Sequence, residues 1–352
     1  MKTLQKYRVI GLMSGTSLDG LDIAYITFTF FKNKWKYELG ECKTISYPDF
    51  WQKKLKNLFS KSEEYILETD NNYGKYLSEC VNAFIKENKL KVELICSHGH
   101  TIFHEPQKKI TLQIGNGDII SKECEKAVVF DFRSKDVELG GQGAPLVPVG
   151  DHLLFSNYKY CLNLGGFSNF SYQENGERIA YDISPLNVVL NKYSNLLGYA
   201  YDDQGTIARK GILNQDLFNE LNELKYYHKK APKSLGIEWV NENFIAIIER
   251  YKESNENILR SCLEHFSFQI GSKLKNNQCL VTGGGAFNTF LIERINHFSN
   301  AEIVIPEKKL VEFKEALVFG FLGVLKFRNQ INCYKSVTGA SQDSISGQLI
   351  DY

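Results

Sequence analysis

The hydrophobic pattern of the chain switches repeatedly between short β-rich runs and longer amphipathic segments. Tyr7–Met13 and Leu21–Phe28 are β-rich and flank the small, polar stretch Ser14–Gly20, which predicts a β-hairpin. Further strands are predicted at Lys36–Ile45, Leu94–Ser97, Thr111–Ile114 and Ala127–Phe130, and helices at Phe50–Leu58 and Tyr73–Asn88. The first half therefore combines hairpin strands with crossover helices, as an α/β domain does.

The second half of the chain repeats this order of elements. Tyr160–Leu164, a glycine-bearing turn and Phe170–Tyr172 again predict strand, turn and strand. Gln278–Val281 leads through three consecutive glycines into a helix that begins near Thr289. Further helices are predicted at Pro185–Leu197, Asn214–Lys225, Asn241–Tyr251, Asn257–Ser272 and Glu315–Phe327. The halves share element order but no visible sequence repeat, and the length of 352 residues suits two α/β domains.

Charge and composition exclude several classes of partner. The chain carries 42 basic and 41 acidic residues, a net charge of +1, which offers no general attraction to nucleic acid or an acidic membrane. No apolar window approaches the ~18 residues of a membrane span, and the apolar run Val9–Met13 is too short for a secretion signal. The eight cysteines include no CxxC pair, which favours reduced thiols and a cytoplasmic location over a disulfide framework.

Three turns of small residues are candidate phosphate sites. Glycines let backbone amides approach an anion, hydroxyl groups donate to phosphate oxygens, and carboxylates can hold a cation. These features belong to Ser14, Gly15, Thr16, Ser17, Asp19, Gly20 and Asp22 in the first turn, Gly165, Gly166 and Asn169 in the second, and Gly283, Gly284 and Gly285 in the third. Each turn alone is also consistent with an ordinary hairpin or helix entry, so only the three together point to a nucleotide.

Asp182 and a group of histidines are further candidates. Asp182 ends a β-rich run beside a predicted helix start, where its carboxylate either reaches a cleft or caps the helix. His98, His100 and His104 resemble a metal cluster, but no cysteine or spaced carboxylate completes a zinc set. Hydrogen bonds to a polar ligand are therefore the favoured role of these histidines.

A polar loop rich in glycine follows these histidines. It contains Arg133, Asp136 and Gln142, and the forked guanidinium of Arg133 suits a carboxylate ligand. The alternative is a structural ion pair of Arg133 with Asp131 or Asp136. The acidic stretch 202–205 is interpreted as a turn and helix cap rather than a metal loop.

Seven ordered motifs resemble those of the anhydro-N-acetylmuramic acid kinase family. They extend nearly from end to end of the chain, and GGQGAPLVP within the fourth is highly specific. The motifs are GLMSGTSLDGLD (11–22), SHGHTIFHEP (97–106), TLQIGNG (111–117), DFRSKDVELGGQGAPLVP (131–148), NLGGFSN (163–169), TGGGAFN (282–288) and SVTGA (336–340). The resemblance implies two actin-like (ribonuclease H-like) α/β domains with a nucleotide cleft between them. Domain I is expected at 1–148 plus 330–352, and domain II at 149–329.

The resemblance also implies a reaction and its cofactors. The family uses ATP to open 1,6-anhydro-N-acetylmuramic acid with water and to phosphorylate O6, in the recycling of peptidoglycan. Mg²⁺ is expected to bridge the phosphates, held through water by Asp19, Asp22 or Asp182. The expected partners are small molecules only, with no nucleic acid and no membrane, and a homodimer is left open.

Individual roles follow from the matched motifs. Asp182 is expected to be the base that activates water, and Glu315, which matches a family glutamate, to help hold that water. Asn288 lies in the motif on the adenosine side. The residues expected at the sugar are His98, Thr101, Arg133, Asp136 and Gln142.

The chain departs from the family pattern at three places. The family's DTGPGN is DISPLN here (182–187), its PPKSTGRE is APKSLGIE (231–238), and His100 replaces a glutamine. Larger side chains in DISPLN are expected to reshape the phosphate and sugar pocket. Two alternatives stay open: an ordinary sugar kinase that phosphorylates a free hydroxyl, and a non-catalytic nucleotide-binding module.

Overall fold

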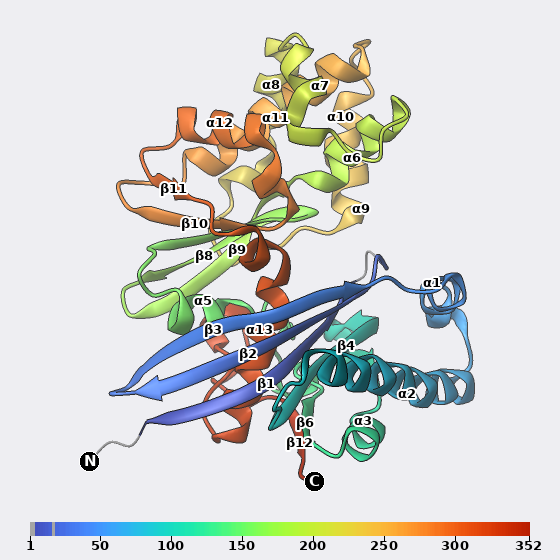
Figure 1. Cartoon of the computed structure of the whole chain (residues 1–352). Helices are drawn as coiled ribbons and strands as arrows, with labels where there is room; N and C mark the ends of the chain where they lie inside the picture. Colours follow the sequence, from blue (N-terminus) through green and yellow to red (C-terminus); the bar gives the residue numbers. More distant parts are fainter. Residues whose placement is uncertain (1–3, 16–17) are drawn as a thin grey trace. The chain divides into compact units, whose positions relative to one another are not determined.

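The computed structural model describes residues 4–15 and 18–352 (Figure 1). The chain forms two compact units: unit 1 comprises Met1–Leu154 with Phe313–Tyr352, and unit 2 comprises Phe155–Glu312. Each unit holds a β-sheet with helices, so the predicted α/β class with two domains is confirmed. The boundaries lie at 154/155 and 312/313, whereas the sequence predicted 148/149 and 329/330.

Unit 1 is built on a mixed sheet. Over the described residues its order is β12-β6-β4-β1-β2-β3, with β5 beside β4. β1, β2 and β3 form an antiparallel meander, and β4 runs parallel to β1 and β6. The strands are β1 (Gln5–Ser14), β2 (Leu21–Phe31), β3 (Lys34–Ile45), β4 (Leu94–Glu105), β5 (Ile110–Ile114), β6 (Ala127–Phe130) and β12 (Gln348–Ile350). The helices are α1 (Asp49–Lys56), α2 (Glu63–Asn88), α3 (Gly117–Cys124), α4 (Ser134–Glu138), α5 (Pro148–Leu154), α14 (Lys335–Thr338) and most of α13 (Lys308–Phe327).

Unit 2 repeats this arrangement of strands. Its sheet has the order β11-β10-β7-β8-β9, in which β7, β8 and β9 form a meander and β10 runs parallel to β7. The strands are β7 (Tyr160–Leu164), β8 (Phe167–Glu174), β9 (Glu177–Pro185), β10 (Gln278–Thr282) and β11 (Glu302–Val304). The helices are α6 (Asn187–Leu196), α7 (Thr206–Lys210), α8 (Gln215–Asn222), α9 (Ile237–Trp239), α10 (Ala246–Ile248), α11 (Asn255–Gly271) and α12 (Thr289–Phe298). A meander followed by parallel strands in both units is the ribonuclease H-like order expected for each domain.

Helix α13 explains the shift of the second boundary. A Cβ placed on Gly11 of β1 would lie 2.0 Å from the carbonyl oxygen of Ala316, and one on Gly323 would lie 2.1 Å from Sγ of Cys96. Glycine at these two positions therefore allows the helix to lie directly on the sheet of unit 1. The apolar pattern showed that this segment is a helix, but it could not show which sheet the helix covers.

Two predicted elements are longer than the pattern indicated. Helix α2 begins at Glu63 rather than at Tyr73, because the side chain of Ser62 caps it by accepting a hydrogen bond from the Tyr65 amide at 3.3 Å. Strand β4 continues past Ser97 to Glu105, because it pairs with β1, β5 and β6. Sheet hydrogen bonds thus keep a polar stretch extended where its sequence suggested a loop.

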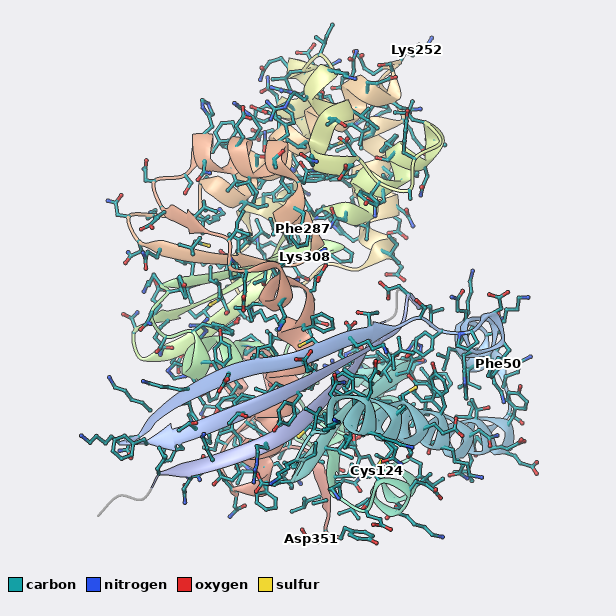
Figure 2. The ribbon with its side chains drawn as sticks, viewed as in Figure 1. Phe50, Cys124, Lys252, Phe287, Lys308 and Asp351 are labelled. Atoms are coloured by element: carbon teal, nitrogen blue, oxygen red, sulfur yellow. The ribbon has the colours of Figure 1, made fainter. Side chains whose placement is uncertain are left out.

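Buried side chains follow the predicted periodicity. In α1, Trp51 and Leu55 lie one turn apart and are buried, whereas Phe50 is 60% exposed (Figure 2). All eight cysteines are free thiols, as expected. Within the described residues, no helix is both long enough and apolar enough to cross a bilayer.

Candidate active site

The site residues predicted from sequence divide between the two units. In unit 2 four polar residues line up across the sheet. Asp182 of β9 faces Asn169 of β8, Asn169 faces Asn163 of β7, and Asn163 faces Thr282 of β10. This register places the predicted base in one row with the second glycine turn and the start of the third.

The two glycine turns of unit 2 pack against each other. A Cβ on Gly283 would lie 2.7 Å from Oδ1 of Asn163, and one on Gly285 would lie 2.9 Å from the carbonyl oxygen of Leu164. Gly283 also has a φ of 83°, which glycine adopts without strain. By contrast, a Cβ on Gly284 would meet nothing within 4 Å. The third turn therefore needs glycine at 283 and 285 because of close packing. The backbone of Gly284, between them, remains open to a ligand.

The DISPLN segment closes the second turn from the other side. The amides of Leu186 and Val188 donate to the carbonyl of Gly166 at 2.9 and 3.2 Å, and Nδ2 of Asn187 donates to the carbonyl of Leu164 at 3.2 Å. Three motifs that are far apart in sequence, 163–169, 182–187 and 282–288, thus meet in one place.

The residues in DISPLN that depart from the family pattern lie in the core of unit 2. Ile183 is 1% exposed and Leu186 is 0% exposed, and both belong to its hydrophobic cluster. Ser184 is also buried, and its hydroxyl pairs with that of Ser168 at 2.8 Å. The larger side chains therefore fill the interior of unit 2, and their effect on the phosphate and sugar pocket stays a prediction.

Asp182 is half-buried on an edge strand beside a β-bulge. The register with β8 shifts between Ser168 and Asn169, so one extra residue follows Asp182 on β9. Its Oδ2 accepts a hydrogen bond from the amide of Leu235 at 2.9 Å. Burial raises the pKa of Asp182, and this bond to Leu235 opposes the rise. Within the described residues Oδ1 accepts no hydrogen bond, so it remains available to a water molecule.

Asn288 and Asp202 act as helix caps. Oδ1 of Asn288 accepts from the Leu291 amide at 2.9 Å at the start of α12. The carboxylate of Asp202 accepts from the amides of Ile207 and Ala208 at 2.8 and 2.9 Å, which confirms the cap interpretation of this acidic turn. The adenosine-side role of Asn288 stays a prediction, and its Oδ1 is already occupied by the cap.

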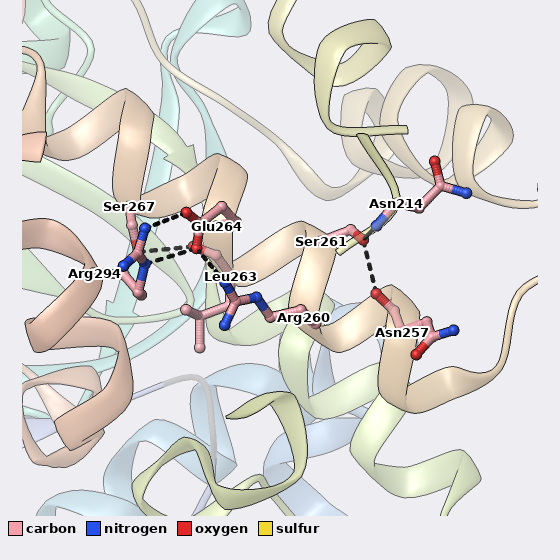
Figure 3. A network of polar contacts seen from close by, with 8 residues as sticks. All are labelled: Asn214, Asn257, Arg260, Ser261, Leu263, Glu264, Ser267 and Arg294. Atoms are coloured by element: carbon pink, nitrogen blue, oxygen red, sulfur yellow. Dashed lines mark hydrogen bonds and ion pairs between the residues drawn. The ribbon is translucent and has the colours of Figure 1, made fainter. Parts of the chain in front are cut away.

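An ionic network supports the helix that follows the third glycine turn (Figure 3). Glu264 of α11 is 5% exposed and pairs with Arg294 of α12 at 2.5 Å and with Arg260 at 3.3 Å. Arg294 holds both carboxylate oxygens, through its Nε and a terminal nitrogen. Loss of either arginine would leave the charge of the buried Glu264 carboxylate less well compensated, which would be unfavourable. The ion pair of Arg294 with Glu264 therefore holds α12 against α11.

In unit 1, Ser14 belongs to a buried chain of side chains. The Tyr47 hydroxyl donates to Oγ of Ser14 at 2.7 Å, and Oγ lies 2.8 Å from Nδ1 of His100. The Tyr73 hydroxyl lies 2.6 Å from that of Tyr47 and is its donor, because Tyr47 uses its own proton on Ser14. Burial lowers the pKa of His100 to about 4, so the neutral ring accepts the Ser14 proton. The Ser14 hydroxyl is thus engaged inside the protein, and the sequence had not indicated Tyr47 or Tyr73.

The rest of the first turn leaves its carboxylates near the surface. Thr16 and Ser17 lie outside the described residues, so their predicted phosphate contacts stay predictions. Asp19 is exposed, and Oδ1 of Asp22 accepts a hydrogen bond from Thr44 at 2.5 Å. Gly20 lies so close to β3 that a Cβ would be 2.6 Å from the carbonyl oxygen of Ile45. This contact fixes where the turn rejoins the sheet.

Arg133 is held by His98. Its Nε and one terminal nitrogen lie 3.1 and 2.8 Å from Nε2 of His98, and its other terminal nitrogen donates to the carbonyl of Gly143 at 2.6 Å. Nδ1 of His98 lies 2.9 Å from the Gly99 carbonyl and carries the proton, which leaves Nε2 as an acceptor. Burial, reinforced by the Arg133 charge, lowers the pKa of His98 well below its usual range. His98 therefore orients Arg133, whose terminal nitrogens retain further donors.

The alternative ion pair of Arg133 with Asp131 or Asp136 does not form within the described residues. Asp131 instead accepts from Ser134 at 2.6 Å and from Gln348 at 2.9 Å. Burial is also the main cause that lowers the pKa of Arg133, to about 10. The guanidinium is thus held by His98 and the Gly143 carbonyl, and its role as an anchor for a carboxylate stays a prediction.

Asp136 connects the glycine-rich loop to the C-terminal SVTGA motif. It is 0% exposed and accepts from the Gly143 amide at 2.8 Å, from the Thr338 hydroxyl at 2.7 Å and from the Cys333 thiol at 3.1 Å. A Cβ on Gly141 would lie 2.2 Å from its Oδ2. Because both carboxylate oxygens are enclosed, the structure favours a positioning role over the predicted contact with substrate. This contact also accounts for the C-terminal motif, to which the sequence could assign no role.

The remaining predicted residues of unit 1 are accessible. Gln142 is exposed, Thr101 of β4 is half-buried opposite Gln113 of β5, and Glu315 of α13 is exposed. Although solvent reaches the Glu315 side chain, the protein around it raises its pKa by desolvation, against the attraction of Arg133 and Lys314.

The carboxylate oxygens of Asp19, Asp22 and Asp182 are ligands of the kind that Mg²⁺ prefers. Within the described residues, no three or more histidine, cysteine or acidic side chains are grouped to hold a metal directly. Each of these carboxylates taken singly suits a Mg²⁺ ion bound through water, and which of them holds the ion stays a prediction.

Comparisons with known proteins agree with these motifs. A family model described as anhydro-N-acetylmuramic acid kinase matches residues 7–351. A protein of that name from Francisella tularensis subsp. novicida is 32% identical and covers 97% of both chains. Another from Sulfurimonas denitrificans is 31% identical and covers 97% of this chain and 99% of the relative.

Solved structures that resemble the chain are more distant. Component A of (R)-2-hydroxyglutaryl-CoA dehydratase from Acidaminococcus fermentans has a TM-score of 0.45 at 12% identity, and covers 91% of this chain and 98% of its own. A ROK family glucokinase from Streptomyces griseus has a TM-score of 0.40 at 11% identity, and covers 90% and 99%. The family match over nearly the whole chain is therefore the decisive comparison, and the chain belongs to the anhydro-N-acetylmuramic acid kinase family.

Proposed function

We propose that this protein is an ATP-dependent kinase that opens 1,6-anhydro-N-acetylmuramic acid with water and phosphorylates the released O6, forming N-acetylmuramic acid 6-phosphate. The main support from the structure is the placement of Asp182. It ends the polar row whose other members, Asn169, Asn163 and Thr282, flank the glycine turns of unit 2, and its Oδ1 is available to water. A carboxylate whose pKa burial has raised is a stronger base than an exposed one.

The proposed reaction joins a hydrolysis to a phosphoryl transfer. Asp182 accepts a proton from water, the water oxygen attacks C1, and the C1–O6 bond breaks. The electron pair left on O6 attacks the γ-phosphorus of ATP, and ADP departs. The proton remains on Asp182 and then passes to solvent. No separate acid is needed for O6, because the phosphoryl group captures its developing charge.

The other residues bind and orient the reactants. The amides and small residues of the glycine turns bind the phosphates and the adenosine side, and Glu315 helps to hold the attacking water. Arg133, oriented by His98, binds the lactyl carboxylate of the sugar. Mg²⁺, held through water by Asp19, Asp22 or Asp182, would neutralise the phosphate charge.

The proposal includes a setting in the cell. The substrate is a fragment of peptidoglycan, so the protein would act in cell-wall recycling in the cytoplasm, with small molecules as its partners. The non-catalytic alternative loses its support, because the substituted residues of DISPLN lie in the core of unit 2.

The direct test is incubation with ATP, Mg²⁺ and the anhydro sugar, followed by mass spectrometry. We expect N-acetylmuramic acid 6-phosphate, with the label from ¹⁸O-water at C1 and none in the phosphate. Phosphorylation of free N-acetylmuramic acid or N-acetylglucosamine without activity on the anhydro sugar would establish an ordinary sugar kinase. ATP binding without turnover of any of these sugars would establish a binding module.

A further inference from the structure

The strand that carries Asp182 is closed by a segment outside the sheet. β9 is an edge strand, and edge strands expose unpaired backbone groups. The amide of Asp182 donates to the carbonyl of Lys233 at 3.2 Å, and its carbonyl accepts a hydrogen bond from the hydroxyl of Tyr226 at 2.6 Å. Both backbone groups of Asp182 are therefore satisfied by the segment 226–235.

The same segment also reaches the carboxylate. The Leu235 amide donates to Oδ2 of Asp182 at 2.9 Å, which leaves Oδ1 to accept a proton from water. Lys233 ties the segment to itself, because its Nζ donates to the Tyr226 carbonyl at 2.9 Å and lies 4.4 Å from the centre of the Tyr226 ring. Tyr226 is 4% exposed and packs on Trp239, with ring centres 5.2 Å apart. The three contacts on Asp182 thus come from a structured support.

We propose that Tyr226, Lys233 and Leu235 form a clasp that orients Asp182, and that Tyr226 is a positioning residue for the reaction. The proposal rests on the proposed function, in which Asp182 is the base. An aspartate at a bulge on an edge strand would otherwise sample several orientations, and general base catalysis requires one of them. The Tyr226 hydroxyl holds the carbonyl of Asp182 and the Lys233 carbonyl holds its amide, so the backbone keeps one orientation. The Leu235 amide binds Oδ2, which leaves Oδ1 to accept the proton.

Tyr226→Phe tests the clasp by removing one hydroxyl from a buried ring. We expect kcat to fall about tenfold with the KM for ATP unchanged, because only the orientation of the Asp182 carboxylate becomes less well defined. A looser Asp182 also loses part of its bond to the Leu235 amide, which holds its pKa down. The acid limb of the rate profile should therefore move to higher pH.

Tyr227→Phe is the matched control. The neighbouring hydroxyl lies 2.9 Å from Nε2 of His265 in the core of unit 2, and Asp182 takes its hydrogen bonds from other residues of the described chain. Its removal should lower the melting temperature and leave kcat and the acid limb at their wild-type values. A general loss of packing would affect both variants alike, whereas a clasp affects only Tyr226→Phe.

The double variant Asp182→Asn with Tyr226→Phe decides whether Tyr226 acts through Asp182. We expect the residual turnover of Asp182→Asn to be unchanged by the second substitution. Wild-type kcat and pH profile in Tyr226→Phe, or an equal fold-loss in the Asp182→Asn background, would overturn the clasp alone. Absence of anhydro-sugar turnover in the wild type would overturn the proposed function and the clasp with it.

Discussion

The two units hold their candidate residues by different physical means. In unit 1, side chains hold side chains: His100 and Tyr47 engage Ser14, and His98 orients Arg133. In unit 2, the backbone does most of this work, through glycine turns in close contact and the bonds to Asp182. Substitutions in unit 1 should therefore act through lost polar partners. In unit 2, side-chain atoms added to the glycine turns should lower the stability of the fold, and loss of the Asp182 carboxylate should lower kcat most.

The largest expected effect is that of Asp182→Asn. The amide keeps the size of the carboxylate but cannot take a proton from water, so kcat should fall by ~10²–10⁴ while the KM for ATP changes by no more than several-fold. Steady-state kinetics at saturating ATP measure both constants. A variant that keeps a tenth of wild-type turnover would show that Asp182 is not the base.

Arg133→Ala tests the inference that, in unit 1, side chains oriented by other side chains bind the substrate. Two charge-assisted bonds to the lactyl carboxylate, at ~1.5–3 kcal/mol each, predict that the KM for the anhydro-muramic sugar rises by about 100-fold or more. An anhydro-glucosamine analogue, which lacks the lactyl arm, should lose little. Equal losses for both sugars would mean that Arg133 only supports the loop through Gly143.

Gly285→Ala and Gly284→Ala compare two neighbouring positions in the backbone-built site. A Cβ at 285 would lie 2.8 Å from Cβ of Leu164 and 2.9 Å from its carbonyl oxygen, so we expect a loss of about 1–3 kcal/mol in the free energy of unfolding. A Cβ at 284 would meet open space, so that variant should unfold close to wild type. Urea titration measures both. Equal stability of the two variants would contradict the close packing of the glycine turns.

His100→Gln should give the smallest effect, visible only in acid. The pKa of His100 is about 4 in the folded protein, below its ordinary 6.5, so the unfolded state binds the extra proton first. Wild-type stability from this residue is thus present above pH 6.5 and is lost as the pH falls towards 4. The melting temperature of His100→Gln should fall less steeply over that range. Parallel curves for the two proteins would show that His100 is not held neutral.

The sequence by itself determined the elements whose signals are local. The hairpin β1–β2, the strand–turn–strand of β7–β8 and the glycine turn between β10 and α12 lie where alternation and turn residues placed them. The family motifs identified the candidate site residues, because the chemistry of a motif depends on the types of residue that it contains.

Tertiary structure decided which of those residues are engaged and by what. The bond from Tyr47 to Ser14 spans 33 positions, and the bond from Leu235 to Asp182 spans 53. No local pattern encodes such pairs, because they depend on how sheets and helices pack. The same reason explains α13: its apolar pattern predicts a buried helix, but only the close approach of Gly11 and Gly323 assigns it to unit 1. Local periodicity therefore determines elements, and long-range packing determines the site.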